Sequence, residues 1–324
     1  MAGERPGFAP GEFYNEATDL LKRHQEFKKS TEIGEHEQSS ELKLDYPTLP
    51  ALVWLATDIH YGSQNTNYEL LDKHFQMLED TPNMFMITNG DEVDNFNAIF
   101  HQSGMMENPM KPQLQTMAIM DKLHQVDDAG KLAGITFGNH NEFMSDSGYD
   151  WSQTFLRDIE APKFPSGGLL HMQVGEQNYD VAMTHRYWGY SKLNPTNAAK
   201  RYLEHEYPDA DLVFLGHFHQ SEILHFDRAG KDRIAVMGGT YKKTDNWARQ
   251  RGIGGRSGEP GYGVLFYPEE RKMVGFKDME VAQQHLLGMI WQEEMRGQGL
   301  TPENFNTKGG VVFEHGERTA GNQG

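Results

Sequence analysis

Five short apolar runs occupy the middle of the chain, and each is followed at once by residues of the types that bind metal ions. The runs are 52–57, 84–88, 135–137, 181–184 and 212–215. Apolar runs of this length between polar segments predict buried strands. The polar residues that follow them are Asp58 and His60, Asp91 and Asp94, Asn139 and His140, His185, and His217 and His219. The pattern predicts strands that deliver ligands to one shared place.

Segments with helical spacing lie between and beyond these runs. Apolar residues recur at helical intervals in 67–80 and 113–126, and 196–207, 279–298 and the short segment 151–159 are further candidates. Alternating strands and helices predict a layered α/β domain, which we place at 51–278. A C-terminal helix within 279–300 and a Gly-rich tail at 301–324 are expected to follow it.

Residues 1–50 read as an N-terminal extension. A charged helix is predicted for 14–29 and a polar linker for 30–42. One interpretation is a loosely docked arm, and the other is a helix that mediates homo-oligomerisation or docks a protein partner.

Composition narrows the functional classes. The chain has 324 residues and no cysteine, which excludes disulfides and thiolate zinc sites. No signal peptide or membrane span is visible, so a cytoplasmic protein without membrane association is expected. The net charge is −17, which opposes general attraction to nucleic acid, although two divalent cations would add about +4 locally.

The candidate ligands combine oxygen and nitrogen donors. Asp91 has two carboxylate oxygens and can bridge two cations, and Asn139 offers a neutral oxygen. Such a mixed set favours Mn²⁺, Fe²⁺, Zn²⁺ or Ni²⁺ over a Mg²⁺ site made of oxygen alone. We assign no role to four histidines within helical patterns, which are His74, His124, His205 and His285.

The ordered series Asp58-Ile-His60, Gly90-Asp91-Glu-Val-Asp94, Gly138-Asn139-His140, Thr184-His185 and Gly216-His217-Phe-His219 resembles the calcineurin-like metallophosphoesterase superfamily. In general character the domain is also similar to bacteriophage-encoded members. The resemblance implies a two-layer β-sandwich flanked by helices, the four-layer αββα fold. It also implies two divalent metal ions, Mn²⁺ first among Fe, Zn, Ni and Mg, about 3.5–4 Å apart and bridged by an attacking hydroxide.

Residue roles follow from the same resemblance. One metal would be held by Asp58, His60 and His219, and the other by Asn139, His185 and His217, with Asp91 bridging both. His140 would lie near the phosphate as proton donor or transition-state stabiliser, and Asp94 would orient it. This chain has Asn141, followed by Glu142, where many members have an acidic residue directly after the histidine.

Basic residues near two of the predicted strand ends are candidates for substrate binding. Segment 241–258 holds five basic residues against one acid and includes Lys242, Lys243 and Trp247. Basic groups beside aromatic rings suit a phosphate-bearing substrate with a base, and a solvated flexible loop is the alternative. Arg186, directly after His185, is a further candidate.

Three functions are compatible with these patterns. The first is hydrolysis of a phosphodiester in a nucleotide or other small molecule, favoured by the acidic charge and the isolated basic segment. The second is a DNA or RNA nuclease resembling the repair exonucleases of the superfamily. A phosphoprotein phosphatase is disfavoured, because Asn95 stands where arginine is usual. The third is a non-catalytic scaffold or assembly subunit.

Overall fold

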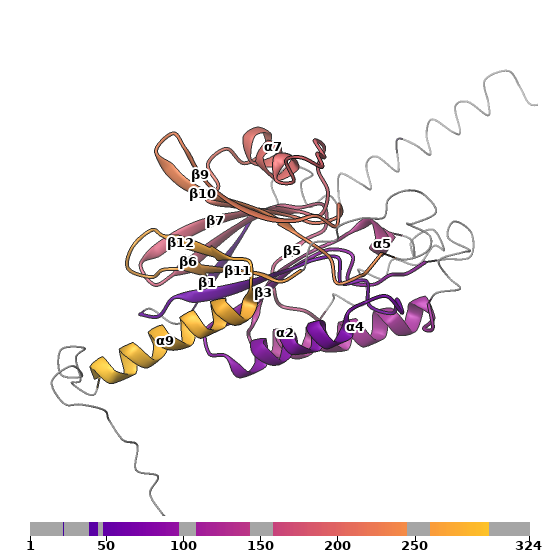
Figure 1. The fold of residues 1–324 in the computed structure, drawn as a ribbon, viewed down its shortest axis with the longest axis horizontal. Coiled ribbons are helices and arrows are strands. Elements are labelled where there is room, and N and C mark those ends of the chain that lie inside the picture. Colours follow the sequence, from indigo (N-terminus) through magenta and orange to yellow (C-terminus); the bar gives the residue numbers. More distant parts are fainter. Residues whose placement is uncertain are drawn as a thin grey trace, which may run out of the picture. The chain divides into compact units, whose positions relative to one another are not determined.

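The computed structural model describes Lys22 and residues 39–44, 48–96, 108–142, 158–244 and 260–297, and shows two facing six-stranded sheets (Figure 1). The chain divides between Ser39 and Ser40, and all elements below lie in the second unit apart from the first residue of β1. One sheet has the order β1 (Ser39–Leu44), β6 (Gly168–Val174), β7 (Gln177–Thr184), β8 (Leu212–Leu215), β10 (Lys231–Gly238) and β9 (Ser221–Arg228). The other has the order β12 (Met273–Phe276), β11 (Tyr262–Phe266), β2 (Ala51–Ala56), β3 (Met84–Asn89), β4 (Leu132–Thr136) and β5 (Lys163–Phe164).

Helices cover the outer faces of both sheets. On the β2–β3–β4 sheet lie α2 (Tyr68–Asp80), α4 (Pro112–Asp128) and α9 (Met279–Gly297), and α7 (Asn197–His205) lies on the other sheet (Figure 1). Between the sheets, apolar side chains from both, such as Val53, Phe85 and Phe214, form one buried cluster. Since the central strands are covered on both faces, their sequences are continuously apolar rather than alternating. The predicted four-layer αββα fold is confirmed.

Strand direction determines where the chain's polar turns meet. β2, β3 and β4 run parallel to one another, as do β7, β8 and β10. Parallel neighbours end at the same edge of a sheet, so the loops that follow them are brought together. A four-residue helical turn, α5 (Asn139–Glu142), begins three residues after β4 ends.

Local signals explain the helix that follows β2. The side chain of Asn67 accepts a hydrogen bond from the backbone N–H of Leu70 and so caps the first turn of α2. Leu71, Phe75 and Leu78, at spacings of four and three, form its buried face. The helices predicted at 67–80, 113–126, 196–207 and 279–298 correspond to α2, α4, α7 and α9.

Two expectations about the flanking segments change. The linker predicted for 30–42 is wrong over its last four residues, because β1 begins at Ser39 and extends the sheet beside β6. α9 is an integral layer of the domain, since Met279, Ala282 and Leu286 are buried in the same core as α2 and α4. No helix within the described ranges is long and apolar enough to cross a membrane.

Other expectations concern residues that the structure does not describe. They are the helix at 14–29 apart from Lys22, most of the segment 151–159, residues 245–258 of the basic segment, and the tail 301–324. The docking or oligomerisation role of the N-terminal extension stays a prediction.

Candidate metal centre

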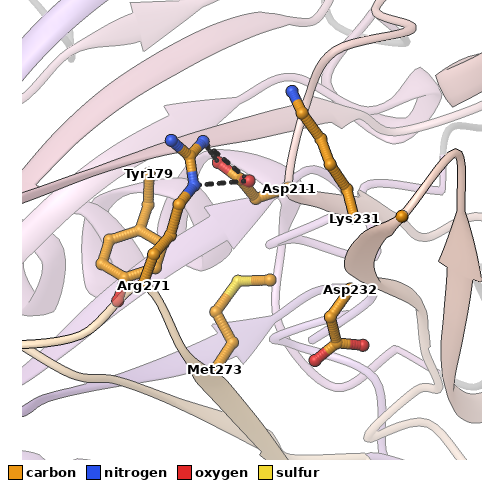
Figure 2. Close-up of a pocket in the computed structure, with 7 residues that line it drawn as sticks. Tyr179, Asp211, Lys231, Asp232, Arg271 and Met273 are labelled. Atoms are coloured by element: carbon orange, nitrogen blue, oxygen red, sulfur yellow. Dashed lines mark hydrogen bonds and ion pairs between the residues drawn. The ribbon is translucent and has the colours of Figure 1, made fainter.

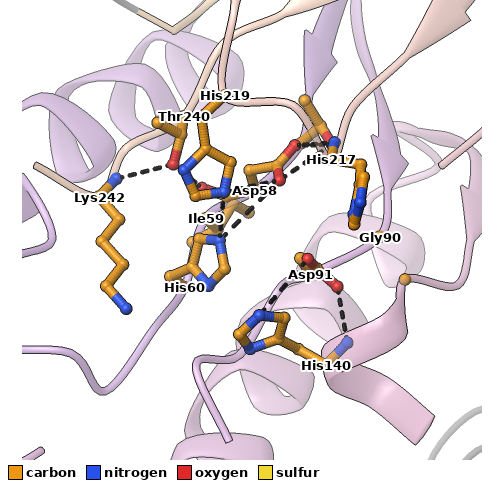
Figure 3. Close-up of polar contacts among 12 residues, drawn as sticks. Asp58, Ile59, His60, Gly90, Asp91, His140, His217, His219, Thr240 and Lys242 are labelled. Atoms are coloured by element: carbon orange, nitrogen blue, oxygen red, sulfur yellow. Dashed lines mark hydrogen bonds and ion pairs between the residues drawn. The ribbon is translucent and has the colours of Figure 1, made fainter. Parts of the chain in front are cut away.

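Asp58, His60 and His219 form the first cluster of candidate ligands (Figure 3). The Nε2 atoms of His60 and His219 are 3.0 Å apart, and Asp58 Oδ1 lies 3.2 Å from His219 Nε2 and 3.9 Å from His60 Nε2. Bonds of about 2.0–2.2 Å from nitrogen and oxygen ligands to one cation place the ligand atoms at similar separations. The loops after β2 and β8 thus bring together residues 159 positions apart.

Asp91, His185 and His217 form the second cluster. Asp91 Oδ2 is 3.1 Å from His185 Nε2, and His217 Nδ1 is 2.7 Å from Asn139 Oδ1. These residues follow β3, β7, β8 and β4 respectively. The structure therefore brings the seven candidate residues close together, and their division between two metal ions, which the resemblance implied, stays a prediction.

The contacts of His185 show that this set suits a cation. Its Nδ1 lies 2.7 Å from the main-chain carbonyl of Asn89, so Nδ1–H donates and a neutral ring presents the lone pair of Nε2 to Asp91 Oδ2. Two acceptors that face each other need a proton or a cation between them. Burial lowers the pKa of His185, but the charges of Asp91 and Asp58 outweigh it and raise this pKa to about 10. A divalent cation satisfies the same two acceptors, so the donor set fits one.

His60 has the arrangement of a metal-binding histidine with a carboxylate behind it. Its Nδ1 lies 3.1 Å from Asp94 Oδ1, which favours a proton on Nδ1 and leaves Nε2 to face the first cluster. Burial is the largest influence on the ring and lowers its pKa to about 4, so His60 is neutral near pH 7. A neutral imidazole is the form that binds metals.

The backbone at the candidate ligands is held in an uncommon conformation. Asp58, His60, Asp91, His217 and His219 have φ values of 48°, 50°, 54°, 69° and 53°. Positive φ is rare outside glycine because of contacts with Cβ. In the described part of the chain eight non-glycine residues have it, and these five are among them. Such strain persists where surrounding contacts impose it, often at functional sites.

Residues that the sequence reasoning missed impose this geometry. Asn89 Nδ2 donates to the carbonyls of Thr184 and Phe214, at 3.0 Å each, and so links β3 to the ends of β7 and β8. Thr57 Oγ1 and the backbone N–H of His217 donate to Asp58 Oδ2, at 2.7 and 2.9 Å. Their place in the sequence could have pointed to these supporting residues, because Thr57 and Asn89 lie one or two residues before a predicted ligand.

Asn141 takes part in this support. Its Oδ1 accepts from the backbone N–H groups of Gly138 and Asp91, at 2.9 and 3.2 Å, and its Nδ2 donates to Glu92 Oε2 at 3.0 Å. Glu92 is buried, which raises its pKa. The amide at position 141 therefore ties the turn after β4 to the turn after β3. The side chain of Glu142 lies outside the described residues.

His140 lies between the two clusters and the solvent. Its Nδ1 contacts the main-chain carbonyl of Asp94, its Nε2 is 3.9 Å from Asp91 Oδ2, and its side chain is 13% exposed. Asp94 does contact His140, and the expectation that it orients His140 stays a prediction. The contact runs through the Asp94 backbone, whereas the Asp94 carboxylate faces His60 and Lys242.

The three predicted substrate-binding residues are placed differently from one another. The ammonium of Lys242 lies 2.6 Å from Asp94 Oδ1 and 4.3 Å from the Phe96 ring centre, and the side chain is 6% exposed. Its charge is paired with a buried carboxylate, and its contact with a substrate stays a prediction. Lys243 and Arg186 are exposed, and their substrate contacts stay predictions.

A separate polar cluster, around Asp211 and Arg271, lies near the N-terminal end of β8, opposite the end that His217 follows (Figure 2). The Arg271 guanidinium makes a bidentate contact with Asp211, at 2.8 Å to each oxygen, beside a cavity of about 230 Å³. The Tyr179 hydroxyl contacts the carbonyls of Tyr267, Glu270 and Lys272. These groups satisfy one another, as in a structural clamp between β8, β7 and the turn before β12.

The fold and the two ligand clusters together are those of a metallophosphoesterase. More specifically, the chain belongs to the calcineurin-like phosphoesterase family, whose model matches residues 51–221.

Solved structures of the same superfamily are similar at low sequence identity. Vacuolar protein sorting 29 from Cryptosporidium parvum is 13% identical with a TM-score of 0.37, and the match covers 71% of this chain and 100% of that one. The calcineurin-like phosphoesterase YfkN from Bacillus subtilis is 14% identical with a TM-score of 0.39, and the match covers 71% of this chain and 90% of that one. No curated protein matches this sequence.

Proposed function

We propose that the chain is a binuclear metal-dependent phosphoesterase that hydrolyses phosphodiester bonds in a nucleotide or another small molecule. The observation that carries this proposal is the facing pair of acceptors at His185 and Asp91, 3.1 Å apart beside a second cluster of buried ligands. A scaffold has no physical need for two such clusters, because unpaired buried acceptors destabilise a fold.

Asp58, His60 and His219 would hold one cation, and Asn139, His185 and His217 the other, with Asp91 between them. Mixed nitrogen and oxygen ligands suit Mn²⁺ first, with Fe, Zn, Ni and Mg as alternatives. Bound divalent cations polarise phosphoryl oxygens and lower the pKa of bound water, which supplies the nucleophile.

The remaining steps belong to the chain's own groups. The contact between His140 Nδ1 and the Asp94 carbonyl directs Nε2 toward the clusters, where it can deliver a proton to the leaving oxygen. Asn89, Thr57 and Asn141 hold the ligand turns before substrate arrives, so little reorganisation accompanies the reaction. The net charge of −17 favours a small substrate over a long nucleic acid.

The test is an assay of the metal-stripped protein with and without Mn²⁺ on bis-p-nitrophenyl phosphate and p-nitrophenyl phosphate. Mn²⁺-dependent cleavage of the diester that Asp91→Asn abolishes is the expected result. Cleavage of the monoester alone would redirect the proposal toward phosphatases. Inactivity on both esters with every metal, in a protein that nonetheless binds two equivalents, would indicate a highly selective pocket. Inactivity without metal binding would favour the scaffold.

A further inference from the structure

Exposed aromatic side chains gather on the loop that follows β7. Trp188 is 54% exposed and Tyr190 is 47% exposed. Large aromatic residues are usually well buried, so two neighbouring exposed rings point to a binding surface. They belong to the lining of a cavity of about 410 Å³, formed by Arg186, Tyr187, Trp188, Gly189, Tyr190 and Phe218. This volume lies within the range of small-molecule sites.

Two residues that line the cavity are neighbours in sequence of candidate metal ligands. Arg186 directly follows His185, and Phe218 stands between His217 and His219. The Phe218 ring lies 5.0 Å from the His217 ring and 4.9 Å from the Tyr190 ring, centre to centre. A continuous series of rings therefore leads from a candidate metal ligand to the exposed loop.

The loop is held in place by α7. The Trp188 ring packs against the Arg201 guanidinium at 4.4 Å and stacks on His205 at 5.4 Å. Tyr187 donates its hydroxyl hydrogen to Glu206 Oε1 at 2.6 Å, and Asn197 Nδ2 donates to the Gly189 carbonyl at 2.6 Å. Rings fixed before binding lose little conformational entropy when a ligand stacks on them.

Charge at this site favours a phosphate-bearing ligand. Within the described ranges the Arg186 guanidinium makes no hydrogen bond or ion pair, and the side chain is exposed at the cavity. Arginine binds phosphate oxygens well because its planar fork can donate two parallel hydrogen bonds. A guanidinium without a partner among the described residues, between an aromatic surface and a metal-ligand cluster, suits a molecule that carries both a phosphate and a flat ring.

We propose that Trp188, Tyr190 and Phe218 form an aromatic rim that stacks on the base of a nucleoside phosphodiester. In this arrangement the phosphodiester lies at the ligand clusters and Arg186 contacts one of its oxygens. The inference rests on the proposed phosphodiesterase function and narrows its substrate to one that carries a nucleobase. Stacking on aromatic side chains tolerates every base, so the rim selects for the presence of a base rather than its identity.

The kinetic test compares two esters with the same leaving group, thymidine 5′-p-nitrophenyl phosphate and methyl p-nitrophenyl phosphate. The ratio of their kcat/KM values isolates the contribution of the nucleoside. In Trp188→Ala the ratio should fall about tenfold, as expected for the loss of one base–aromatic stack. Trp188→Phe should retain most of it. Trp291→Ala removes a tryptophan of α9 that is 46% exposed and should leave the ratio unchanged.

A binding measurement separates failure of this inference from failure of the proposed function. Calorimetry on the full chain with Mn²⁺ compares AMP with ribose 5-phosphate, and needs no turnover. Tighter binding of AMP that Trp188→Ala or Tyr190→Ala removes would support the rim even if neither ester were cleaved. Equal affinities for the two ligands, or an AMP preference unchanged in both variants, would overturn it.

The same variants show whether the stacked base belongs to a small nucleotide or to a nucleic acid strand. A dinucleotide and a single strand of ten nucleotides present the same chemistry at different lengths. Weaker binding of the dinucleotide in Trp188→Ala would indicate a small nucleotide substrate, and an effect on the ten-nucleotide strand alone would indicate a nucleic acid. An effect on neither would contradict the inference.

Discussion

The two ends of β8 carry polar clusters of opposite character. After its last residue come His217 and His219, whose partners are the candidate ligands of the other loops. Before its first residue is Asp211, which is 4% exposed at its side chain and fully engaged by Arg271 and the Asp180 backbone. Only five residues separate Asp211 from His217 in the sequence.

The difference lies in how the polar atoms are satisfied. Around Asp211 each acceptor faces a donor. Around His185, the neutral ring sets the Nε2 lone pair against Asp91 Oδ2 at 3.1 Å, so this pair needs a proton or a cation to be complete. Positive φ values also concentrate at the ligand end. A cluster that is complete without a ligand indicates structure, whereas one that needs a cation to be complete indicates a binding site.

The largest effect is expected from changing a carboxylate at each end. Asp91→Asn should reduce phosphodiesterase turnover by at least about a thousandfold and lower metal content, because one ligand charge is lost. Asp211→Asn should keep the metal content and lose about 2 kcal/mol of stability through a weakened Arg271 contact. Metal analysis, kinetics and urea unfolding of both variants test this contrast, and loss of metal from Asp211→Asn would break it.

A smaller loss of activity is expected without loss of metal. His140→Ala should lower kcat by about 10²–10⁴-fold, the usual size for a proton donor, while two metals remain bound. The reason is that His140 faces the two clusters without belonging to either, although its ring nitrogen also lies within 4.8 Å of candidate ligand atoms of His60 and Asp94. A parallel fall in metal content would show that it acts as a ligand.

Lys242 and Lys243 offer a matched test within one turn. Lys242→Met should destabilise the protein by about 3 kcal/mol, because it leaves the buried Asp94 carboxylate without its cation. Lys243→Met changes an exposed residue and should alter stability by less than about 0.5 kcal/mol. Urea unfolding of the metal-free proteins measures both. Equal stabilities would show that the Lys242 ion pair contributes nothing to the fold.

A buried histidine away from both clusters should give a pH effect. His74 packs beside Trp54, with Nδ1 2.5 Å from the Tyr241 hydroxyl, and burial lowers its pKa from 6.5 to about 4. The unfolded chain therefore binds the proton more readily, so His74 costs no stability above pH 6.5 and destabilises as pH falls toward 4.

At pH 5 this loss should be about 2 kcal/mol relative to pH 7. Urea unfolding gives the free energy of unfolding of metal-free wild type and His74→Gln at the two pH values. The fall in this free energy from pH 7 to pH 5 should be larger in the wild type by this amount. An identical pH dependence in both proteins would contradict the assignment.

Some of the fold and site followed from local sequence. Apolar runs of four to six residues at β2, β3, β7 and β8 mark buried strands because only apolar side chains tolerate cover on both faces. The seven candidate ligands were visible because each follows such a run directly. β1 was missed because its burial alternates along a sheet edge, and its polar residues resemble a linker.

The sequence by itself therefore determined the central buried strands, the types of candidate ligand and the family. Only the tertiary structure decided which groups are paired. Lys242 and Asp94, 148 positions apart, neutralise each other, and Trp188 is exposed beside a ligand cluster rather than buried. The physical reason is that apolar periodicity depends on neighbours along the chain, whereas charge pairing and exposure depend on which loops the sheet order brings to the same edge.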